Sequence, residues 1–198
     1  MKLSSLAGRR IVVASKNPGK LREFGEILGS REFSLCDLAD LPPVRFPEEG
    51  SDYAENAIAK ATAASGQLGE IALADDSGLE VEGLAAAPGP HSARFGGPGL
   101  DDQGRVAHLL AALAKDPAAS RRARFVCYAA LVTPQGRIET AFGECAGTIL
   151  EAPRGANGFG YDPVFQVEGM RETMADLPAA QKNEISHRGR ALRALFES

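Results

Sequence analysis

Short apolar runs alternate with longer segments of helical periodicity along the first part of the chain. Residues 11–14 and 71–74 are uninterrupted apolar runs, which are typical of strands buried on both faces. Apolar residues recur at helical spacing over residues 18–28 and again from about residue 52 to 68. Asn17 is suited to cap the first helix, and Asp52 the second. The pattern therefore predicts strands and helices in alternation.

A hairpin is predicted in the second part of the chain. Residues 124–132 form a long apolar run, residues 133–136 are turn-forming, and apolar positions alternate after them. A helix with Asp101 and Asp102 in its opening turn precedes this hairpin, and a C-terminal helix with Ser186 as its cap follows it. This order of elements predicts an α/β fold with a mixed sheet and helices on its faces.

Two adjacent acids follow the apolar run of residues 71–74. Asp75 and Asp76 precede Ser77 and Gly78, which favour a turn, and residues 79–82 alternate as a returning strand would. Successive side chains of a strand point to opposite faces, so we expect the two carboxylates to have different partners. One can hold a divalent metal while the other ties down a neighbouring loop. The alternative is a pair of solvated acids at an ordinary turn.

The segment between the first strand and the first helix is typical of a phosphate site. Backbone N–H groups and the helix dipole favour an anion at a helix N-terminus. Lys16 and Lys20 add positive charge there, and Ser15 and Asn17 add hydrogen-bond donors. The spacing of a P-loop is absent. The alternative is a capped helix with surface lysines.

Further polar residues gather in segments that are expected to be loops or element ends. Glu48 and Glu49 lie in an acidic, proline-rich segment, and Asn56 and Lys60 lie one turn apart on the second helix, where a solvated helix face is the favoured interpretation. Residues 154–163 are glycine-rich with two aromatic residues and an acid, a composition that lets a flat ring approach the backbone. Arg94 lies in a Gly- and Pro-rich loop and is a candidate phosphate contact.

Composition narrows the class of protein. The 198 residues fit a single domain, or one domain with a smaller lobe. A formal net charge of −4 argues against binding nucleic-acid polymers by phosphate neutralisation. No segment has the apolar length of a signal peptide or a membrane span, and the three cysteines lack metal-ligand spacing. Cys127 lies in an apolar strand and is expected to be a buried thiol. A soluble cytoplasmic protein is expected.

Together, the basic residues, the carboxylates and the aromatic loop predict a nucleotide polyphosphate site. Lysine and arginine would neutralise phosphates, and Mg²⁺ on carboxylates would bridge phosphate oxygens. The sequence has neither the nucleophile elbow of serine hydrolases nor the spacing of a zinc site. Hydrolysis by a metal-activated water is the chemistry that these residues favour.

Seven motifs in order resemble the inosine triphosphate pyrophosphatase family, also called the Ham1-like non-standard purine nucleotide pyrophosphatases. They are Ser15-x-Asn17-x-x-Lys20, Glu48-x-Gly50, Glu55-Asn56-Ala57, Ala74-Asp75-Asp76-Ser77-Gly78-Leu79, Pro88-Gly89 with Ser92-Ala93-Arg94, Gly158-Phe159-Gly160-Tyr161-Asp162-Pro163, and Ser186-His187-Arg188. The resemblance covers nearly the whole chain. It implies Mg²⁺-dependent hydrolysis of ITP, dITP and XTP to the monophosphate and pyrophosphate. It also implies a homodimer and an elongated mixed sheet in two lobes with an active-site cleft between them.

The resemblance also implies roles for individual residues. Asp76 would be a metal ligand and the catalytic base, with Glu48 as the favoured second ligand and its neighbour Glu49 as the alternative. Ser77 would contact substrate. The triphosphate would be held by Ser15, Lys16, Asn17, Pro18, Gly19 and Lys20. The base and the adjoining phosphates would be surrounded by Phe159, Gly160, Tyr161, Asp162, Lys182, His187 and Arg188. Lys16 stands where relatives commonly have Gly or Thr.

Donors at the 6-position of the base would explain purine selectivity. Hypoxanthine and xanthine present a 6-oxo acceptor where adenine presents an amino donor, so His187 or Arg188 at that edge would reject adenine. Guanine would have to be rejected at its 2-position. Two other functions fit the same residues less well: a house-cleaning pyrophosphatase for pyrimidine or modified nucleotides, and a nucleotide-sensing module without catalysis. The carboxylates beside the predicted phosphate site argue against the sensing module.

Overall fold

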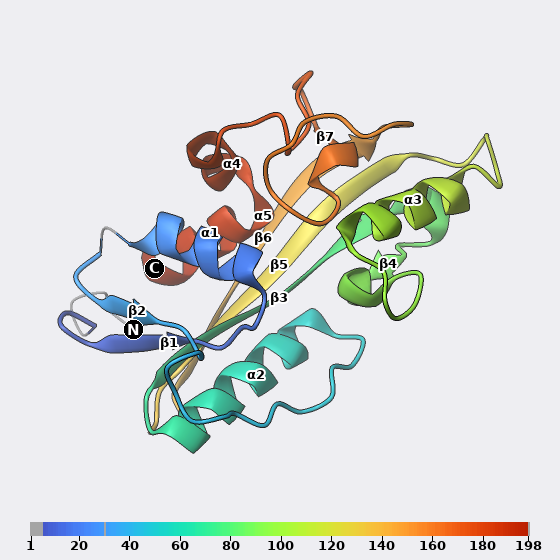
Figure 1. The fold of residues 1–198 in the computed structure, drawn as a ribbon. Helices are drawn as coiled ribbons and strands as arrows, with labels where there is room; N and C mark the ends of the chain where they lie inside the picture. Colours follow the sequence, from blue (N-terminus) through green and yellow to red (C-terminus); the bar gives the residue numbers. More distant parts are fainter. Residues whose placement is uncertain (1–5, 30, 198) are drawn as a thin grey trace. The chain divides into compact units, whose positions relative to one another are not determined.

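The computed structural model describes residues 6–29 and 31–197, and its chain forms a seven-stranded mixed sheet with helices (Figure 1). The strands are β1 (Arg10–Val13), β2 (Ser34–Cys36), β3 (Ile71–Val81), β4 (Pro88–Gly89), β5 (Arg122–Val132), β6 (Ile138–Ile149) and β7 (Phe165–Val167). The helices are α1 (Pro18–Leu28), α2 (Tyr53–Leu68), α3 (Asp102–Leu113), α4 (Ala179–Ile185) and α5 (His187–Glu197). Short 3₁₀ helices are η2 (Glu82–Leu84), η3 (Ser92–Arg94) and η4 (Asp162–Val164). The predicted α/β class with a mixed sheet is confirmed.

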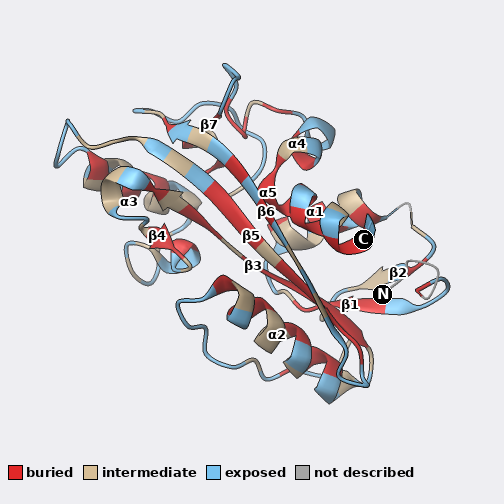
Figure 2. Cartoon of the chain, turned by 180° about the vertical axis from the view of Figure 1, so that it is seen from behind, coloured by how far each residue is buried: buried red, intermediate tan, exposed pale blue. Residues whose placement is uncertain are grey.

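The order of the strands is β2-β1-β3-β5-β6-β7, with β4 paired to β3. β1 is parallel to both β2 and β3, whereas β4 is antiparallel to β3 and β7 is antiparallel to β6. A tight turn at residues 133–136 joins β5 to β6, as the sequence predicts. Burial differs between the strands: β3 is buried along almost its whole length, whereas exposed and covered residues alternate along β6 (Figure 2).

Contacts divide the chain into two compact units. The first unit contains residues 1–76, 127–143 and 188–198, and the second contains residues 77–126 and 144–187. The strands β3, β5 and β6 each contribute residues to both units. No helix among the described residues is long and apolar enough to cross a membrane.

The first unit packs helices on both faces of its strands. Ile71 and Leu73 of β3 belong to a core cluster that includes residues of α1 and α5. Ala72 and Ala74 face the opposite way and pack with residues of α2. The alternation of strand side chains thus directs odd-numbered residues of β3 toward α1 and α5 and even-numbered residues toward α2.

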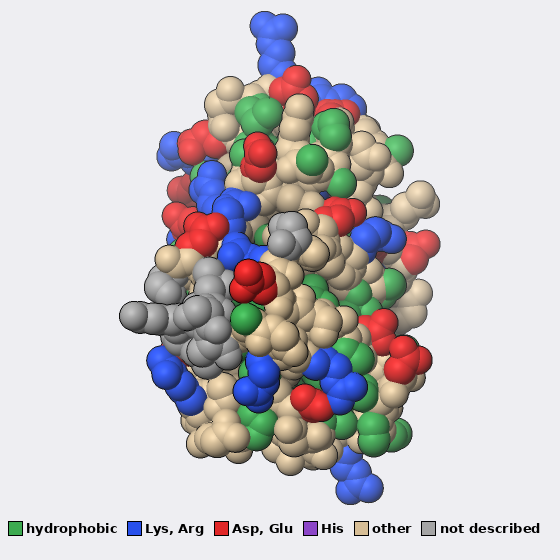
Figure 3. Space-filling model, turned by 90° about the vertical axis from the view of Figure 1, so that its left-hand side faces the viewer, with side chains coloured by type: hydrophobic (Ala, Val, Ile, Leu, Met, Phe, Trp, Pro, Cys, Tyr) green, Lys and Arg blue, Asp and Glu red, His purple; other side chains and the backbone are tan. Residues whose placement is uncertain are grey.

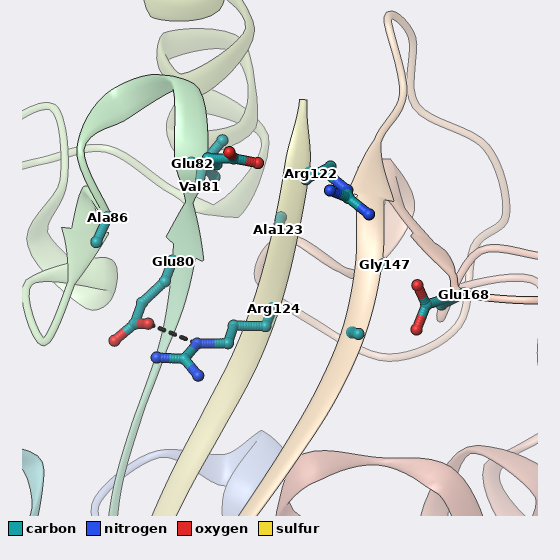
Figure 4. A pocket seen from close by; sticks show the side chains of 10 residues that line it. Glu80, Val81, Glu82, Ala86, Arg122, Ala123, Arg124, Gly147 and Glu168 are labelled. Carbon is teal, nitrogen blue, oxygen red and sulfur yellow. Dashed lines mark hydrogen bonds and ion pairs between the residues drawn. The ribbon is translucent and has the colours of Figure 1, made fainter. Parts of the chain in front are cut away.

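The second unit has a single main core cluster. Its residues come from the ends of β3, β5 and β6, from α3, and from the segment that contains η4 and β7. The predicted apolar stripe of α3 is confirmed, with Val106, Leu109 and Leu113 buried. Figure 4 shows a pocket of about 370 Å³ on this unit, lined by ten residues that include Glu80, Arg122 and Glu168. None of the ten is a predicted site residue.

One local prediction is wrong. The sequence predicts two strands over residues 71–82 with a turn at Ser77 and Gly78, but β3 runs straight through them to Val81. The turn preference of Asp, Ser and Gly is overridden because ion pairs hold both carboxylates and pairing to β4 continues the strand at Leu79. Lys182 precedes the C-terminal helix α5, as predicted, and it lies inside a separate short helix, α4, that the sequence pattern does not predict.

Candidate functional site

The first unit brings Asp76 together with two residues of α2. Asn56 Nδ2 donates to Asp76 Oδ2 at 2.8 Å, and Lys60 Nζ lies 3.1 Å from Asp76 Oδ1. Asn56 also donates to the carbonyl of Gly50 and accepts from its N–H, which fixes the loop before α2. The interpretation of Asn56 and Lys60 as a solvated helix face is therefore wrong. Both lie beside the buried alanine stripe of α2, and that adjacency is the signal that could have identified them.

Lys60 places one cation between two carboxylates. Its Nζ is 2.9 Å from Glu49 Oε1 as well as 3.1 Å from Asp76 Oδ1. Burial alone would lower the pKa of Lys60, but the charges of Asp76, Asp75 and Glu49 raise it above its usual value. Asp76 of β3 and Glu49 of the segment before α2 therefore lie close enough to share one cation, here the Lys60 ammonium. Glu48 is exposed and adjacent to Glu49.

The carboxylates of this site fit a Mg²⁺ ion that is also coordinated by the phosphates of the substrate. The described part of the chain has no ready cluster of three or more His, Cys, Asp or Glu that could hold a metal ion. Mg²⁺ is commonly held by only one or two carboxylates, with phosphates and water completing its coordination. Asp76 with Glu48 or Glu49 satisfies that requirement.

Asp75 faces the other way and anchors α1 and α5. Lys20 Nζ lies 2.9 Å from Asp75 Oδ1, and Arg188 donates from Nε and Nη2 to Asp75 Oδ2 at 3.1 and 3.0 Å. Arg188 Nη1 also donates to Glu23 Oε2, and the arginine is only 2% exposed. The expectation that Asp75 and Asp76 have different partners is thus confirmed. Sequence reasoning missed Glu23, which is a buried acid on α1.

The two neighbouring carboxylates have opposite pKa shifts. Burial would raise the pKa of Asp75, but the charges of Lys20 and Arg188 hold it far below its usual range. Burial also raises the pKa of Asp76, and there Lys60 and Asn56 offset only part of the effect. Asp75 is therefore a permanently ionised structural group. Asp76 is the carboxylate of the two that more readily accepts a proton.

The segment before α1 is ordered by its own cap. Asn17 Oδ1 accepts from the N–H groups of Gly19 and Lys20 at 2.8 and 3.2 Å, and Ser15 Oγ accepts from the N–H of Asn17. Helix α1 spans the predicted residues, with Pro18 in its first turn. Two of the N–H groups expected to bind phosphate are thus held by Asn17, while Lys16 is exposed.

The second unit brings together Phe159, Asp162 and Lys182. The Phe159 N–H donates to Asp162 Oδ2 at 2.8 Å, and Lys182 Nζ lies 2.5 Å from the same oxygen. Lys182 Nζ also lies 5.0 Å from the centre of the Phe159 ring. Asp162 and Lys182 are both buried, so each neutralises the charge of the other.

The other predicted site residues of this unit contact different parts of the structure. Tyr161 donates its hydroxyl to the carbonyl of Ser92 at 2.9 Å, and burial raises its pKa. His187 stacks on Phe125 with ring centres 4.8 Å apart. The Gly160 N–H donates to Asp102 of α3, a residue to which sequence reasoning gave no role beyond its place in the helix. Ser77 is half-buried on β3.

Comparison with known proteins identifies the family. The Ham1 family model matches residues 11–198. The chain belongs to the Ham1 family. It is 46% identical over 189 residues to a dITP/XTP pyrophosphatase of Desulforamulus reducens, covering 95% of this chain and 94% of the relative. It is 48% identical over 189 residues to a dITP/XTP pyrophosphatase of Geobacter sulfurreducens, covering 94% of each.

Solved Ham1 structures share the fold. A HAM1 protein from Coxiella burnetii has a TM-score of 0.84 at 41% identity, with 94% of this chain and 96% of that chain covered. A nucleoside-triphosphatase / dITP/XTP pyrophosphatase from Mycobacterium abscessus has a TM-score of 0.75 at 42% identity, with 96% and 100% covered. The family predicted from the seven sequence motifs is therefore confirmed.

Proposed function

We propose that this Ham1 protein hydrolyses non-standard purine nucleoside triphosphates to the monophosphate and pyrophosphate. Near-full-length relatives at 46–48% identity are named dITP/XTP pyrophosphatases, which supports this substrate class. The observation that carries the proposal is the convergence of Asn56, Lys60 and Asp76. Asp76, whose pKa is raised, accepts from Asn56 there and shares the Lys60 ammonium with Glu49. That pairing suits proton transfer next to a metal-bound phosphate.

The proposed reaction assigns the proton to Asp76. The oxygen of a water molecule forms a bond to the α-phosphorus, the bond from that phosphorus to the bridging oxygen breaks, and pyrophosphate leaves. Asp76 accepts the proton of the attacking water. When bound, Mg²⁺ would neutralise phosphate charge and polarise the phosphorus, held by Asp76 with Glu48 favoured as second ligand and Glu49 as the alternative.

The proposed substrate contacts are the ones that the family resemblance implies. Ser77 and residues 15–20 would hold the triphosphate, with Lys20 kept in place by its ion pair to Asp75. Phe159, Gly160, Tyr161, Asp162, Lys182 and His187 would recognise the base. Arg188 would take part in this recognition with its guanidinium held in orientation by Asp75 and Glu23. Figure 3 shows acidic and basic side chains interspersed on the face displayed, so that face has no continuous basic surface for a nucleic-acid polymer.

We further propose that the protein is a cytoplasmic homodimer. Cys36, Cys127 and Cys145, which all lie among the described residues, form no disulfide, which suits a reducing compartment, and the dimer follows from the family resemblance. Light scattering of the purified protein would show about twice the chain mass of 20.8 kDa if it is a dimer. A particle of single-chain mass at micromolar concentration would contradict this part of the proposal.

A nucleotide panel in labelled water tests the reaction itself. ITP, XTP, GTP, ATP and dUTP are incubated with the protein in H₂¹⁸O, with Mg²⁺ or with EDTA. We expect ITP and XTP to give pyrophosphate and a monophosphate that carries the label, only with Mg²⁺. Preferred cleavage of dUTP would instead favour the pyrimidine house-cleaning alternative. Release of inorganic phosphate, or binding without turnover of any nucleotide, would contradict the proposal.

A further inference from the structure

The loop of residues 158–162, here called the 158–162 loop, is a tight turn whose Tyr161 and Asp162 side chains bond to Ser92 and Lys182 of the second unit. Gly158 and Gly160 both have positive φ angles, 74° and 63°. Within the loop, the Asp162 carboxylate accepts from the Phe159 N–H and pairs with Lys182. Gly160 has no side chain, so the rest of the second unit can hold it only through its backbone, and its N–H makes such a bond.

Asp102 is the group that holds Gly160. This first residue of α3 accepts the Gly160 N–H on Oδ2 at 2.7 Å, across 58 residues of sequence. Its other oxygen, Oδ1, accepts from Arg105 Nη2 at 2.6 Å, and Arg105 Nη1 donates to the Leu100 carbonyl at 2.5 Å. Burial would raise the pKa of Asp102, but the bonds from Arg105 and Gly160 lower it, so the carboxylate is ionised at neutral pH. The Asp102 carboxylate that accepts the Gly160 N–H is thus charged, and Arg105 holds its orientation.

The neighbouring aspartate has a different partner. Asp101 caps α3 by accepting the Gly104 N–H on Oδ1 at 2.8 Å. Helix capping and loop anchoring are therefore divided between two adjacent residues of the same type. The α3 cap does not require Asp102, which leaves its carboxylate available for the loop.

We propose that Asp102 is a positioning residue that fixes the 158–162 loop for base recognition. This inference rests on the proposed function, because it assigns the loop to the base of the substrate. Asp102 acts through Gly160 and takes no part in bond cleavage. Its loss therefore weakens substrate binding and base discrimination more than it slows turnover of the bound substrate.

The test compares Asp102→Ala, Asp102→Asn and Asp101→Ala with the wild type. Loss of a hydrogen bond to a charged group predicts that KM for ITP rises on the order of ten-fold in Asp102→Ala. We expect kcat to change by less than about two-fold and the kcat/KM ratio of ITP over ATP to fall. Asp102→Asn keeps an acceptor oxygen, so it should recover most of the wild-type KM. Asp101→Ala should lower Tm and leave KM and the ratio unchanged.

Amide hydrogen exchange of Gly160 tests the contact without any assay of activity. NMR of the full chain should show that this N–H is protected in the wild type and exchanges roughly ten-fold faster or more in Asp102→Ala. If Asp102→Ala does not fold, Asp102→Ser, whose hydroxyl is too short to reach Gly160, serves in the same comparisons.

The outcomes separate this inference from the proposed function. A wild type that does not cleave ITP contradicts the proposed function, while Gly160 exchange still reports on the anchor. An active wild type with unchanged KM and unchanged base ratio in the Asp102 variants overturns the inference. An equal loss in Asp101→Ala would overturn it as well, because α3 stability rather than the carboxylate would then be the cause.

Discussion

Two adjacent aspartates show how the same side chain serves two purposes. Asp75 is buried and ion-paired to Lys20 and Arg188, while Asp76 shares Lys60 with Glu49 and accepts from Asn56. The pKa of Asp75 is lowered and that of Asp76 is raised. Strand alternation, read from the sequence, is sufficient to predict that their partners differ. The identity of those partners is not predictable in the same way, because it depends on which helix covers each face of β3.

Replacing Asp75 by Asn should destabilise the protein strongly. The change leaves the buried Arg188 and the partly buried Lys20 without their shared carboxylate, which costs about 3–5 kcal/mol in free energy of unfolding. Because the folded pKa of Asp75 is depressed, its stabilisation is fully present above its unfolded pKa of about 3.9 and is lost only as pH falls through the folded value. Urea unfolding at pH 7 measures this decrease in the free energy of unfolding. Asp40→Asn, at an exposed position, is the control and should change the free energy by less than about 0.5 kcal/mol.

Replacing Asp76 by Asn should have the opposite effect on stability. Its raised folded pKa means that the ionised carboxylate is disfavoured in the folded state, so a neutral isostere raises Tm at pH 7. The gain should shrink as pH falls and vanish below the unfolded pKa of about 3.9, where Asp76 is protonated in both states. Thermal melts from pH 7 to pH 4 measure the difference in Tm between Asp76→Asn and the wild type. A lower Tm for Asp76→Asn at pH 7 would contradict this account of the carboxylate.

At the scale of elements, local signals are most reliable where a cap defines a boundary. Helix α1 begins at Pro18 behind Asn17, and α2 follows the Asp52 cap, both as predicted. The prediction fails at residues 75–78, where turn-forming residues lie inside β3. Local preference gives way there because pairing to β1 and β4 at either end of the strand, and ion pairs to its acids, are tertiary contacts that the sequence does not display.

The N-terminus of α1 allows its capping and its proposed binding role to be separated. Asn17→Ala removes the acceptor for the Gly19 and Lys20 N–H groups and should cost about 1 kcal/mol in free energy of unfolding. Asn17→Asp keeps the cap and suits the helix dipole, so stability should be retained. Its negative charge should nevertheless raise KM for ITP by about ten-fold or more through repulsion of phosphate. An unchanged KM in Asn17→Asp would show that the triphosphate binds elsewhere.

The 158–162 loop should not tolerate a side chain at Gly158. A Cβ there would meet the Asp162 carboxylate, and the φ angle of 74° adds strain of about 1–2 kcal/mol. Gly158→Ala should therefore displace Asp162 from Lys182 and raise KM for ITP by about ten-fold or more. Gly136→Ala is the matched control, since Gly136 has a φ of 80° with open space around it. Equal KM values in both variants would contradict the proposed role of the loop.

For the whole molecule, the sequence predicts the class of fold and the family more securely than the geometry of the site. The mixed sheet and the Ham1 family are confirmed, because hydrophobic periodicity and seven ordered motifs depend on many residues at once. Periodicity alone gives no sign of two units that share three strands, because such a division depends on contacts between distant segments. It gives no sign of the anchoring role of Asp102 either, since its partner Gly160 is 58 residues away and offers only a backbone N–H.

Pyrophosphate release from ITP by wild type and by Asp76→Asn is the most direct test of the central claim. Both proteins are assayed with Mg²⁺, with ATP as the competing substrate, after circular dichroism has shown that the variant is folded. The account predicts rapid release from ITP by the wild type, little release from ATP, and a loss of about a hundred-fold or more in kcat for Asp76→Asn. Wild-type turnover of ITP that persists in a folded Asp76→Asn variant would contradict the assignment of the chemistry to this carboxylate.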